Sequence, residues 1–224
     1  MYYYPNLFNR GQVPVRESDK VIKVFGEGVV LARPDQAIVT LGVITEDNNL
    51  QQAQQKNAQD STNVINAIVN SGVSRENIQT TDYRVDIQYD FQNGQQVFRG
   101  YRITSILTIK IENIQSVGEI VDIAVDSGAN TVRNIDLTIS NPDRYYHQAF
   151  EKAIQNAKAK ADTAASTLGV IVPDVPARLK ELSNLTPEPP RPYVLGVSTE
   201  SAVTTPIEAG QNQIRASVEA TFNY

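Results

Sequence analysis

Residues 142–169, PDRYYHQAFEKAIQNAKAKADTAASTLG, carry the strongest helix pattern of the chain. Alanine recurs at every fourth position, so one stripe along a helix face holds Ala149, Ala153, Ala157, Ala161 and Ala165. Alanine side chains are short, so we expect another backbone, that of a sheet, to approach this stripe closely. Asn141 suits the N-cap, Pro142 the first helical position and Gly169 a left-handed C-cap.

Composition excludes several classes of protein. The 224 residues are many for one domain and few for two, and the net charge is −5 with 20 scattered Lys and Arg. A nucleic-acid-binding face needs clustered basic residues, so nucleic acid is not an expected partner. The absence of cysteine excludes thiol catalysis, disulfides and cysteine-ligated metals. No apolar run approaches the ~20 residues of a membrane span.

The first 19 residues differ from the rest. They begin MYYYPNLFNRG and are read as a flexible tail, with an aromatic arm that docks on a partner as the alternative. They lack a basic start followed by an apolar stretch, so no secretory signal is recognised. This favours a cytoplasmic location. Residues 20–224 are expected to form one domain.

Two strands are predicted over 21–32 (VIKVFGEGVVLA) and 37–45 (AIVTLGVIT), joined at Pro34 in a hairpin. Gly26 and Gly28 do not form a phosphate loop, because Leu31 replaces the third glycine and a strand follows. Residues 48–72 predict a helix that ends at Gly72.

The clearest strand alternation covers 78–91 and 97–112, with Asn93-Gly94 between them. A two-residue loop would pair odd positions with even ones and place the two apolar faces on opposite sides. We therefore expect either a loop with an odd residue count or a bulge near Phe98-Arg99.

An amphipathic helix follows over 113–128, and strands are predicted at 132–140, 175–185 and 213–224. The fold class is α+β: a mixed, largely antiparallel sheet with about three helices, in the order ββαββαβα followed by C-terminal strands. Two later motifs have ordinary explanations. Pro187-x-x-Pro190 fits a surface loop better than a polyproline ligand, and the sequon at Asn184 is read as chance.

Three groups of residues are candidates for chemical sites. The one histidine, His147, shares a helix side with Asp143 and Glu151, which would suit a general base, but no nucleophile accompanies it. Carboxylates at every fourth position, Asp82, Asp86 and Asp90, share the polar face of a strand and could hold a divalent cation, yet exposed charge explains them better. Residues 47–49 (DNN) lack calcium-loop spacing and indicate an N-cap. No catalytic, cofactor-binding or metal-binding residue is therefore predicted.

Several short motifs resemble the SIMPL-domain family, a domain of unknown function, from about Val21 to Tyr224. The motifs that carry the resemblance are VFGEG at 24–28, Pro34-Asp35, Leu41-Gly42-Val43, Ser71-Gly72-Val73, Ile78-Gln79-Thr80, Arg99-Gly100-Tyr101, the alanine helix and Thr205–Gly210. The resemblance implies an α+β protein that self-associates, in some members into ring-like or channel-like assemblies. Many members carry a secretion signal and are linked to envelope or stress phenotypes, so a periplasmic location is the alternative.

Two classes of function follow. The first is a non-enzymatic, self-associating protein, at least a dimer, that uses a sheet edge or the apolar face of the hairpin at 83–112, with Ile106 pointing outward. The alternative is a small-ligand-binding protein or an undetected hydrolase with a pocket between sheet and helices.

Overall fold

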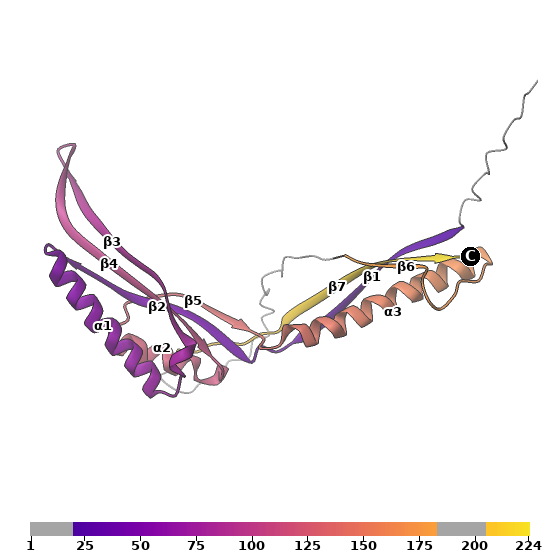
Figure 1. Ribbon diagram of the computed structural model, residues 1–224, viewed down its shortest axis with the longest axis horizontal. Helices are drawn as coiled ribbons and strands as arrows, with labels where there is room; N and C mark the ends of the chain where they lie inside the picture. Colours follow the sequence, from indigo (N-terminus) through magenta and orange to yellow (C-terminus); the bar gives the residue numbers. More distant parts are fainter. Residues whose placement is uncertain (1–19, 183–204) are drawn as a thin grey trace, which may run out of the picture. The chain divides into compact units, whose positions relative to one another are not determined.

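The computed structural model describes residues 20–182 and 205–224 (Figure 1). Within these ranges the fold is α+β, with three α-helices and two antiparallel sheets, in orders β1-β7-β6 and β3-β4-β2-β5. The described residues divide into two compact units. The first, called the α3 unit, holds residues 20–29, 146–182 and 215–224, and the second, called the hairpin unit, holds 30–145 and 205–214.

In the α3 unit, the helix α3 (Pro142–Leu168) packs on the sheet of β1 (Val21–Ala32), β7 (Asn212–Asn223) and β6 (Arg178–Glu181). The five alanines of the stripe are at most 4% exposed. Gly26 and Gly28 of β1 lie directly beneath them: an added Cβ would fall 2.0 Å from the Ala153 carbonyl oxygen at Gly26 and 1.8 Å from that of Ala149 at Gly28. The predicted close approach is confirmed, and the two glycines make room for the helix backbone.

The ends of α3 also follow the sequence signals. The Asn141 side chain accepts a hydrogen bond from the backbone N–H of Arg144 (3.2 Å), and the helix begins at Pro142. Gly169 takes a φ of 69°, the left-handed conformation expected of a glycine just after a helix. Capping and chain reversal are thus encoded locally.

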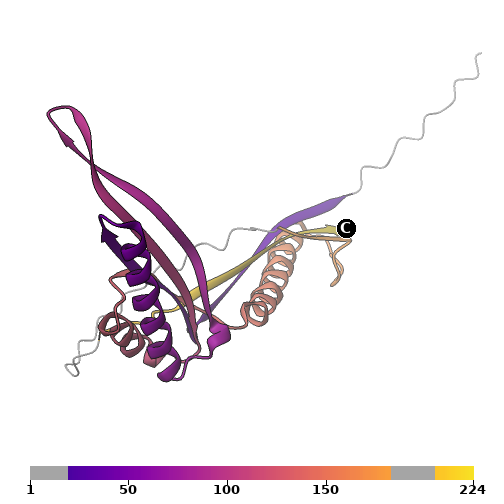
Figure 2. The ribbon, with the colours of Figure 1, turned by 60° about the vertical axis from the view of Figure 1, so that its left-hand side comes forward.

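The hairpin unit is built on β2 (Gln36–Asp47), β3 (Ile78–Gln92), β4 (Gln95–Ile111) and β5 (Thr131–Thr138). The helices α1 (Leu50–Asn70) and α2 (Val117–Asp126) cover one face of this sheet (Figures 1 and 2). Short 3-10 turns, Arg75–Asn77 and Ile114–Ser116, lead into β3 and α2. The core lies between the helices and the odd-numbered side chains of β2 and β4, among them Val39, Leu41, Leu107 and Ile109. Buried Asn57 donates from its amide to the carbonyls of Val43 (3.0 Å) and Ile103 (3.3 Å), which ties α1 to both strands.

The hairpin of β3 and β4 resolves the parity conflict by a bulge. Asn93 and Gly94 form a two-residue loop with φ of 53° and 79°, as a type I′ turn requires. The register then shifts: Tyr89 lies opposite Phe98 but Gln88 opposite Gly100, so Arg99 is the extra residue. The predicted bulge near Phe98-Arg99 is confirmed. Below it odd residues face odd residues, as Val85 and Ile103 do.

The predicted hairpin between the first two strands is wrong. β1 pairs with β7, whereas β2 pairs with β4 and β5. The connection between them is held by the end of β5: the Asp35 N–H donates to the Thr138 carbonyl (3.0 Å), and the Asp35 carboxylate accepts from both N–H and hydroxyl of Ser140 (2.7 Å each). The hydrogen bonds from the hydroxyl and N–H of Ser140 lower the pKa of the Asp35 carboxyl. Together with the bond to Thr138, they hold the chain extended instead of turning it back.

The outward position expected for Ile106 is also wrong, because its side chain is only 1% exposed. It lies on the sheet face opposite the helices, against Gly42, where an added Cβ would fall 2.7 Å from its Cδ1. Arg133 of β5 reaches Asp82 of β3 (3.7 Å) over this part of the sheet. A long polar side chain can cover apolar surface in this way.

Candidate functional site

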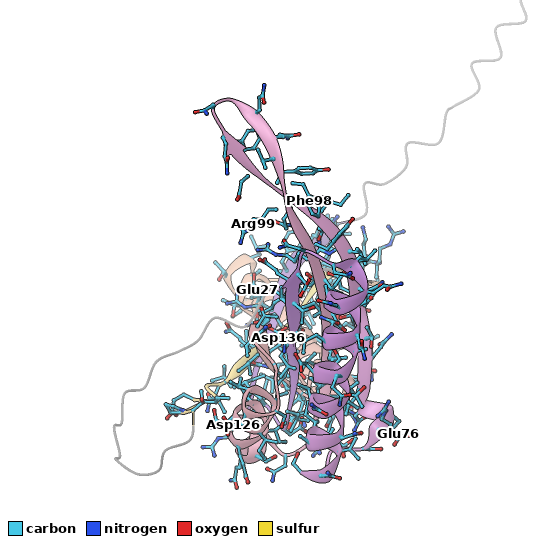
Figure 3. All side chains as sticks on the ribbon, turned by 90° about the vertical axis from the view of Figure 1, so that its left-hand side faces the viewer. Glu27, Glu76, Phe98, Arg99, Asp126 and Asp136 are labelled. Atoms are coloured by element: carbon cyan, nitrogen blue, oxygen red, sulfur yellow. The ribbon has the colours of Figure 1, made fainter. Side chains whose placement is uncertain are left out.

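Among the described residues, no third strand pairs with the far end of the hairpin. Pairing between β2 and β4 ends at Asp47 and Tyr101, so residues 88–100, here called the arm, are a two-stranded ribbon. Figure 3 shows the arm extending beyond the end of α1, with Phe98 and Arg99 labelled near its base. Isolated two-stranded hairpins are marginally stable in water, so a projecting arm is a natural place for contact with another molecule.

An exposed apolar row runs along β3 into the arm. This β3 row consists of Tyr83, Val85, Ile87, Tyr89 and Phe91, whose exposed fractions lie between 42% and 72%. The register places the row on the same sheet side as Ile103, which is fully buried. The β3 row is exposed and Ile103 is buried because α1 packs on β2 and β4, while β3 is the outer strand. Near the base of the arm Phe98 makes edge-to-face contacts with Tyr89 and Tyr101, at 6.5 and 5.3 Å between ring centroids.

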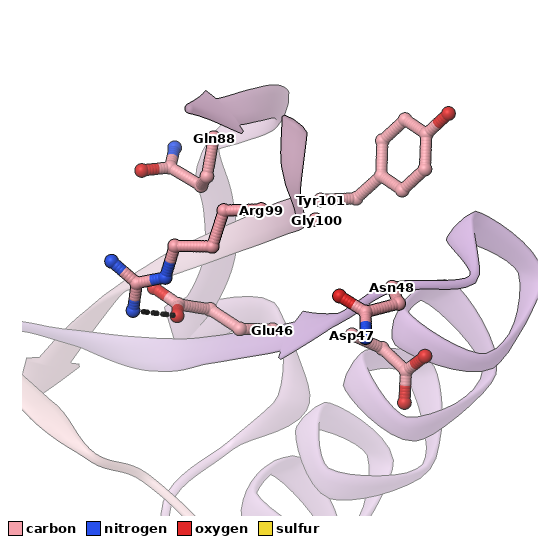
Figure 4. A pocket seen from close by; sticks show the side chains of 7 residues that line it. All are labelled: Glu46, Asp47, Asn48, Gln88, Arg99, Gly100 and Tyr101. Carbon is pink, nitrogen blue, oxygen red and sulfur yellow. Dashed lines mark hydrogen bonds and ion pairs between the residues drawn. The ribbon is translucent and has the colours of Figure 1, made fainter. Parts of the chain in front are cut away.

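A cavity of about 310 Å³ lies at the root of the arm (Figure 4). Polar groups surround it, with Arg99, Gln88 and Glu46 on one side and Asp47 and Asn48 on the other. Glu46 accepts from two arginines, Arg99 (3.2 Å) and Arg102 (2.6 Å), and Asp90 lies 3.9 Å from Arg99, so both guanidinium groups already have carboxylate partners within the chain. The cavity can therefore supply hydrogen bonds to a small polar molecule but no unpaired cation.

The backbone of the bulge shapes this cavity. Gly100 has a φ of 156°, and an added Cβ there would fall 2.9 Å from the Asp47 carbonyl oxygen and 3.1 Å from Asn48 Oδ1. Asn49 caps α1 by accepting from the N–H groups of Gln51 (2.9 Å) and Gln52 (3.2 Å). The predicted N-cap is confirmed, and the neighbouring Asp47 carboxylate accepts from the N–H of Asn49.

A smaller cavity of about 120 Å³ lies in the α3 unit between β1, β7 and the start of α3. Tyr146 lines it and donates its hydroxyl to Glu181 of β6. This hydrogen bond, helped by burial and by the negative charge of Glu181, raises the pKa of Tyr146 to about 12. The phenol stays protonated at neutral pH, so it acts as a donor and not as a base.

The candidate residues for acid–base chemistry do not form a site. His147, Asp143 and Glu151 are all exposed on α3, and no side-chain hydrogen bond or ion pair joins them. Within the described ranges no group of three or more His, Asp or Glu side chains is placed to hold a metal ion. The sequence analysis named none of these three as a site residue, and their side chains do not converge on one point in the structure.

The three aspartates of β3 do not form a cation site either. Asp82 pairs with Arg84 (3.1 Å) and Arg133 (3.7 Å), and Asp90 lies 3.9 Å from Arg99. Asp86 is exposed and forms no ion pair within the described residues. The first 19 residues, Asn184 and Pro187-x-x-Pro190 lie outside the described residues.

Sequence reasoning missed how the outer edge of β1 is closed. Three α3 side chains one helical turn apart reach its backbone: Lys152 donates to the Val29 carbonyl (3.3 Å), Lys160 donates to the Phe25 carbonyl (2.7 Å), and Asn156 accepts from the Glu27 N–H (3.2 Å). The spacing of four residues is visible in the sequence, but their targets lie more than 120 positions away. This edge is therefore capped within the chain.

A match to a known protein family covers nearly the whole chain. The family SIMPL, described as a protein of unknown function (DUF541), matches residues 22–222, nearly all of the chain. The chain belongs to the SIMPL family. The predicted resemblance is confirmed, and the match spans both compact units.

Two kinds of relative represent the family. The 26 kDa periplasmic immunogenic protein of Brucella melitensis is 29% identical over 215 residues, covering 90% of this chain and 83% of that protein. The uncharacterized protein YggE of Escherichia coli K12 is 24% identical over 164 residues, covering 73% and 67%. Among the described residues of this SIMPL protein, no helix is both long and apolar enough to cross a membrane.

Proposed function

We propose that this SIMPL protein is a non-enzymatic protein that self-associates through β3, with the arm and the β3 row as its contact surface. The observation that carries the proposal is an apolar row on an outer strand whose backbone edge is uncapped. Among the described residues, no side-chain hydrogen bond ends on a β3 backbone atom, in contrast to β1. An open, long edge with apolar side chains is a template for pairing with another chain.

Association would supply the cover that the fold lacks. Five neighbouring side chains of the β3 row are more than 40% exposed, including three aromatic rings. Contiguous exposed apolar surface on a soluble protein marks an interaction site, and aromatic residues dominate the energetics of such contacts. A second copy presents the same row, so one symmetric contact covers both.

The proposed location is the periplasm. The support is the name of the Brucella relative, a periplasmic immunogenic protein that aligns over 90% of this chain. A role in the cell envelope fits that location. Fractionation of the native host with an antibody to the chain tests this part, and recovery in the cytoplasm alone would contradict it.

Two valine substitutions test the contact surface. Val85 of the β3 row and Val132 of β5 are both strand residues of the hairpin unit, exposed to 42% and 41%. Val85→Lys places two charges in the proposed contact and should shift the association equilibrium toward monomer by about tenfold or more. Val132→Lys is the matched control and should leave it unchanged.

Sedimentation velocity over a micromolar concentration series measures both variants and the native chain. Native protein that sediments as a monomer throughout the series would overturn the proposal. Equal behaviour of the two lysine variants would show that the contact lies elsewhere.

A second candidate function is binding of a small polar molecule in the cavity at the root of the arm. Its size, about 310 Å³, lies at the lower end of ligand sites, and its lining offers amide, carboxylate and backbone groups. A thermal-shift screen with free amino acids and polyols tests it. A stabilisation that disappears in Gln88→Leu would support this function, and no shift with any of these compounds would count against it.

A further inference from the structure

Resting on the proposed self-association, we infer the register of the contact: two copies pair β3 with β3 antiparallel, about a twofold axis at Val85. The other outer strands are poorer candidates. β1 is capped by α3, β6 has only four residues, and β5 carries a bulge at Arg133 and has its Leu137 carbonyl bound by Asn212. β3, with 15 residues, offers the long free edge.

The side-chain period of two restricts the position of the axis. The β3 rows of both copies share one face only if odd residues lie opposite odd residues. In a twofold antiparallel pair, this holds whenever the axis passes through a residue and not between two residues. An axis at Arg84 or Asp86 is excluded because like charges would meet on it, and an axis at Gln88 because Asp86 would lie opposite the partner's Asp90.

Charge complementarity selects among the odd positions. With the axis at Val85, Arg84 of each copy lies opposite the partner's Asp86, so the contact gains two opposite-charge pairs. Tyr83 then faces the partner's Ile87, which continues the apolar row across the contact. The pairing uses Asp86, the β3 carboxylate that forms no ion pair within the described part of its own chain.

Neighbouring registers use carboxylates that are already paired. An axis at Ile87 sets Arg84 opposite the partner's Asp90, which lies near Arg99 of its own chain (3.9 Å). An axis at Tyr83 sets Arg84 opposite the partner's Asp82, which Arg84 and Arg133 of its own chain already hold. In that register the irregularity between Thr80 and Asp82 lies next to the axis, whereas with the axis at Val85 it lies toward the ends of the contact. Of these three axes, only the one at Val85 places Asp86 opposite a basic residue of the partner, Arg84, which also lies 3.1 Å from Asp82 of its own chain.

A charge-swap series tests the register. Asp86→Arg sets two arginines opposite each other at both ends of the axis and should weaken association by about tenfold. Arg84→Asp should act in the same direction. The double variant Arg84→Asp with Asp86→Arg restores both opposite-charge pairs and should recover most of the native association.

Asp90→Arg separates the registers, because with the axis at Val85 Asp90 lies opposite the partner's uncharged Thr80. It should weaken association clearly less than Asp86→Arg does, with the dissociation constants measured by sedimentation at low and at high salt. Weakening by Asp90→Arg, with recovery in Arg84→Asp plus Asp90→Arg, would overturn the Val85 axis in favour of Ile87. If none of these substitutions changes the dissociation constant, pairing through β3 is wrong. If the native chain is itself a monomer, the proposed function is wrong.

Discussion

The two long outer strands, β1 and β3, carry the same kind of sequence but differ in what happens at their edges. Both alternate apolar and polar residues, and both leave apolar side chains exposed, Phe25 and Leu31 on β1 and the row on β3. On β1, three side chains of α3 occupy outward backbone groups. On β3, no described side chain does so. Whether an edge is open to another chain is thus decided by the helix beside it.

The largest effect is expected from separating α3 from β1. Ala157→Leu adds three carbons where Ala157 is fully buried against Gly26, and should lower the free energy of unfolding by about 1–3 kcal/mol. Ala159→Leu, on the exposed side of the same helix, is the control and should change it little. Urea denaturation compares the two, and equal midpoints would mean that α3 does not pack closely on β1.

A smaller effect is expected at the start of the same helix, where Tyr146 donates a hydrogen bond to Glu181 of β6. Tyr146→Phe removes this hydrogen bond and should cost about 1 kcal/mol or less, because the site is only partly buried. The pKa of Tyr146 is raised in the folded chain to about 12, so the bond contributes fully below pH ~10 and is lost as pH rises toward 12.

Denaturation midpoints of native protein and Tyr146→Phe should therefore differ at pH 8 and converge by pH 12. A difference that persists at pH 12 would assign the effect to packing with Phe150, whose ring stacks on that of Tyr146.

The smallest effect on stability, but an informative one, is expected from uncapping β1. Replacing Lys152, Asn156 and Lys160 together by alanine removes exposed or half-exposed groups and should change the free energy of unfolding by about 0.5 kcal/mol or less. It frees the β1 edge, so new concentration-dependent association should appear. The control is Glu151→Ala with Gln155→Ala on another side of α3. If light scattering shows the same degree of association for both variants, the hydrogen bonds from these three side chains do not prevent pairing at the β1 edge.

Much of the fold follows from local sequence signals. The alanine stripe predicts α3 and its close approach to a sheet. The parity of β3 and β4 predicts either a loop with an odd residue count or a bulge near Phe98-Arg99, and the structure has the bulge, at Arg99. The hairpin between β1 and β2 was the natural expectation, since consecutive strands usually pair. It failed because Asp35 binds Ser140, a partner 105 positions away that no local pattern reveals.

The candidate surface was predictable only in outline. Alternation identifies Tyr83, Val85 and Ile87 as one apolar face, but exposure depends on how far α1 reaches across the sheet. Ile106 is the opposite case. The alternation places its side chain on the outward face, but the side chain is buried because Arg133 and Asp82 cover it. Burial at a sheet margin is set by contacts between distant segments.

The central claim, that β3 is the open edge and β1 the closed one, is tested most directly by amide hydrogen exchange at two protein concentrations. Peptides covering Ile78–Gln92 should exchange more slowly as concentration rises through the association range, while peptides covering Val21–Ala32 should not change. Protection that rises with concentration in β1 but not in β3 would contradict the account.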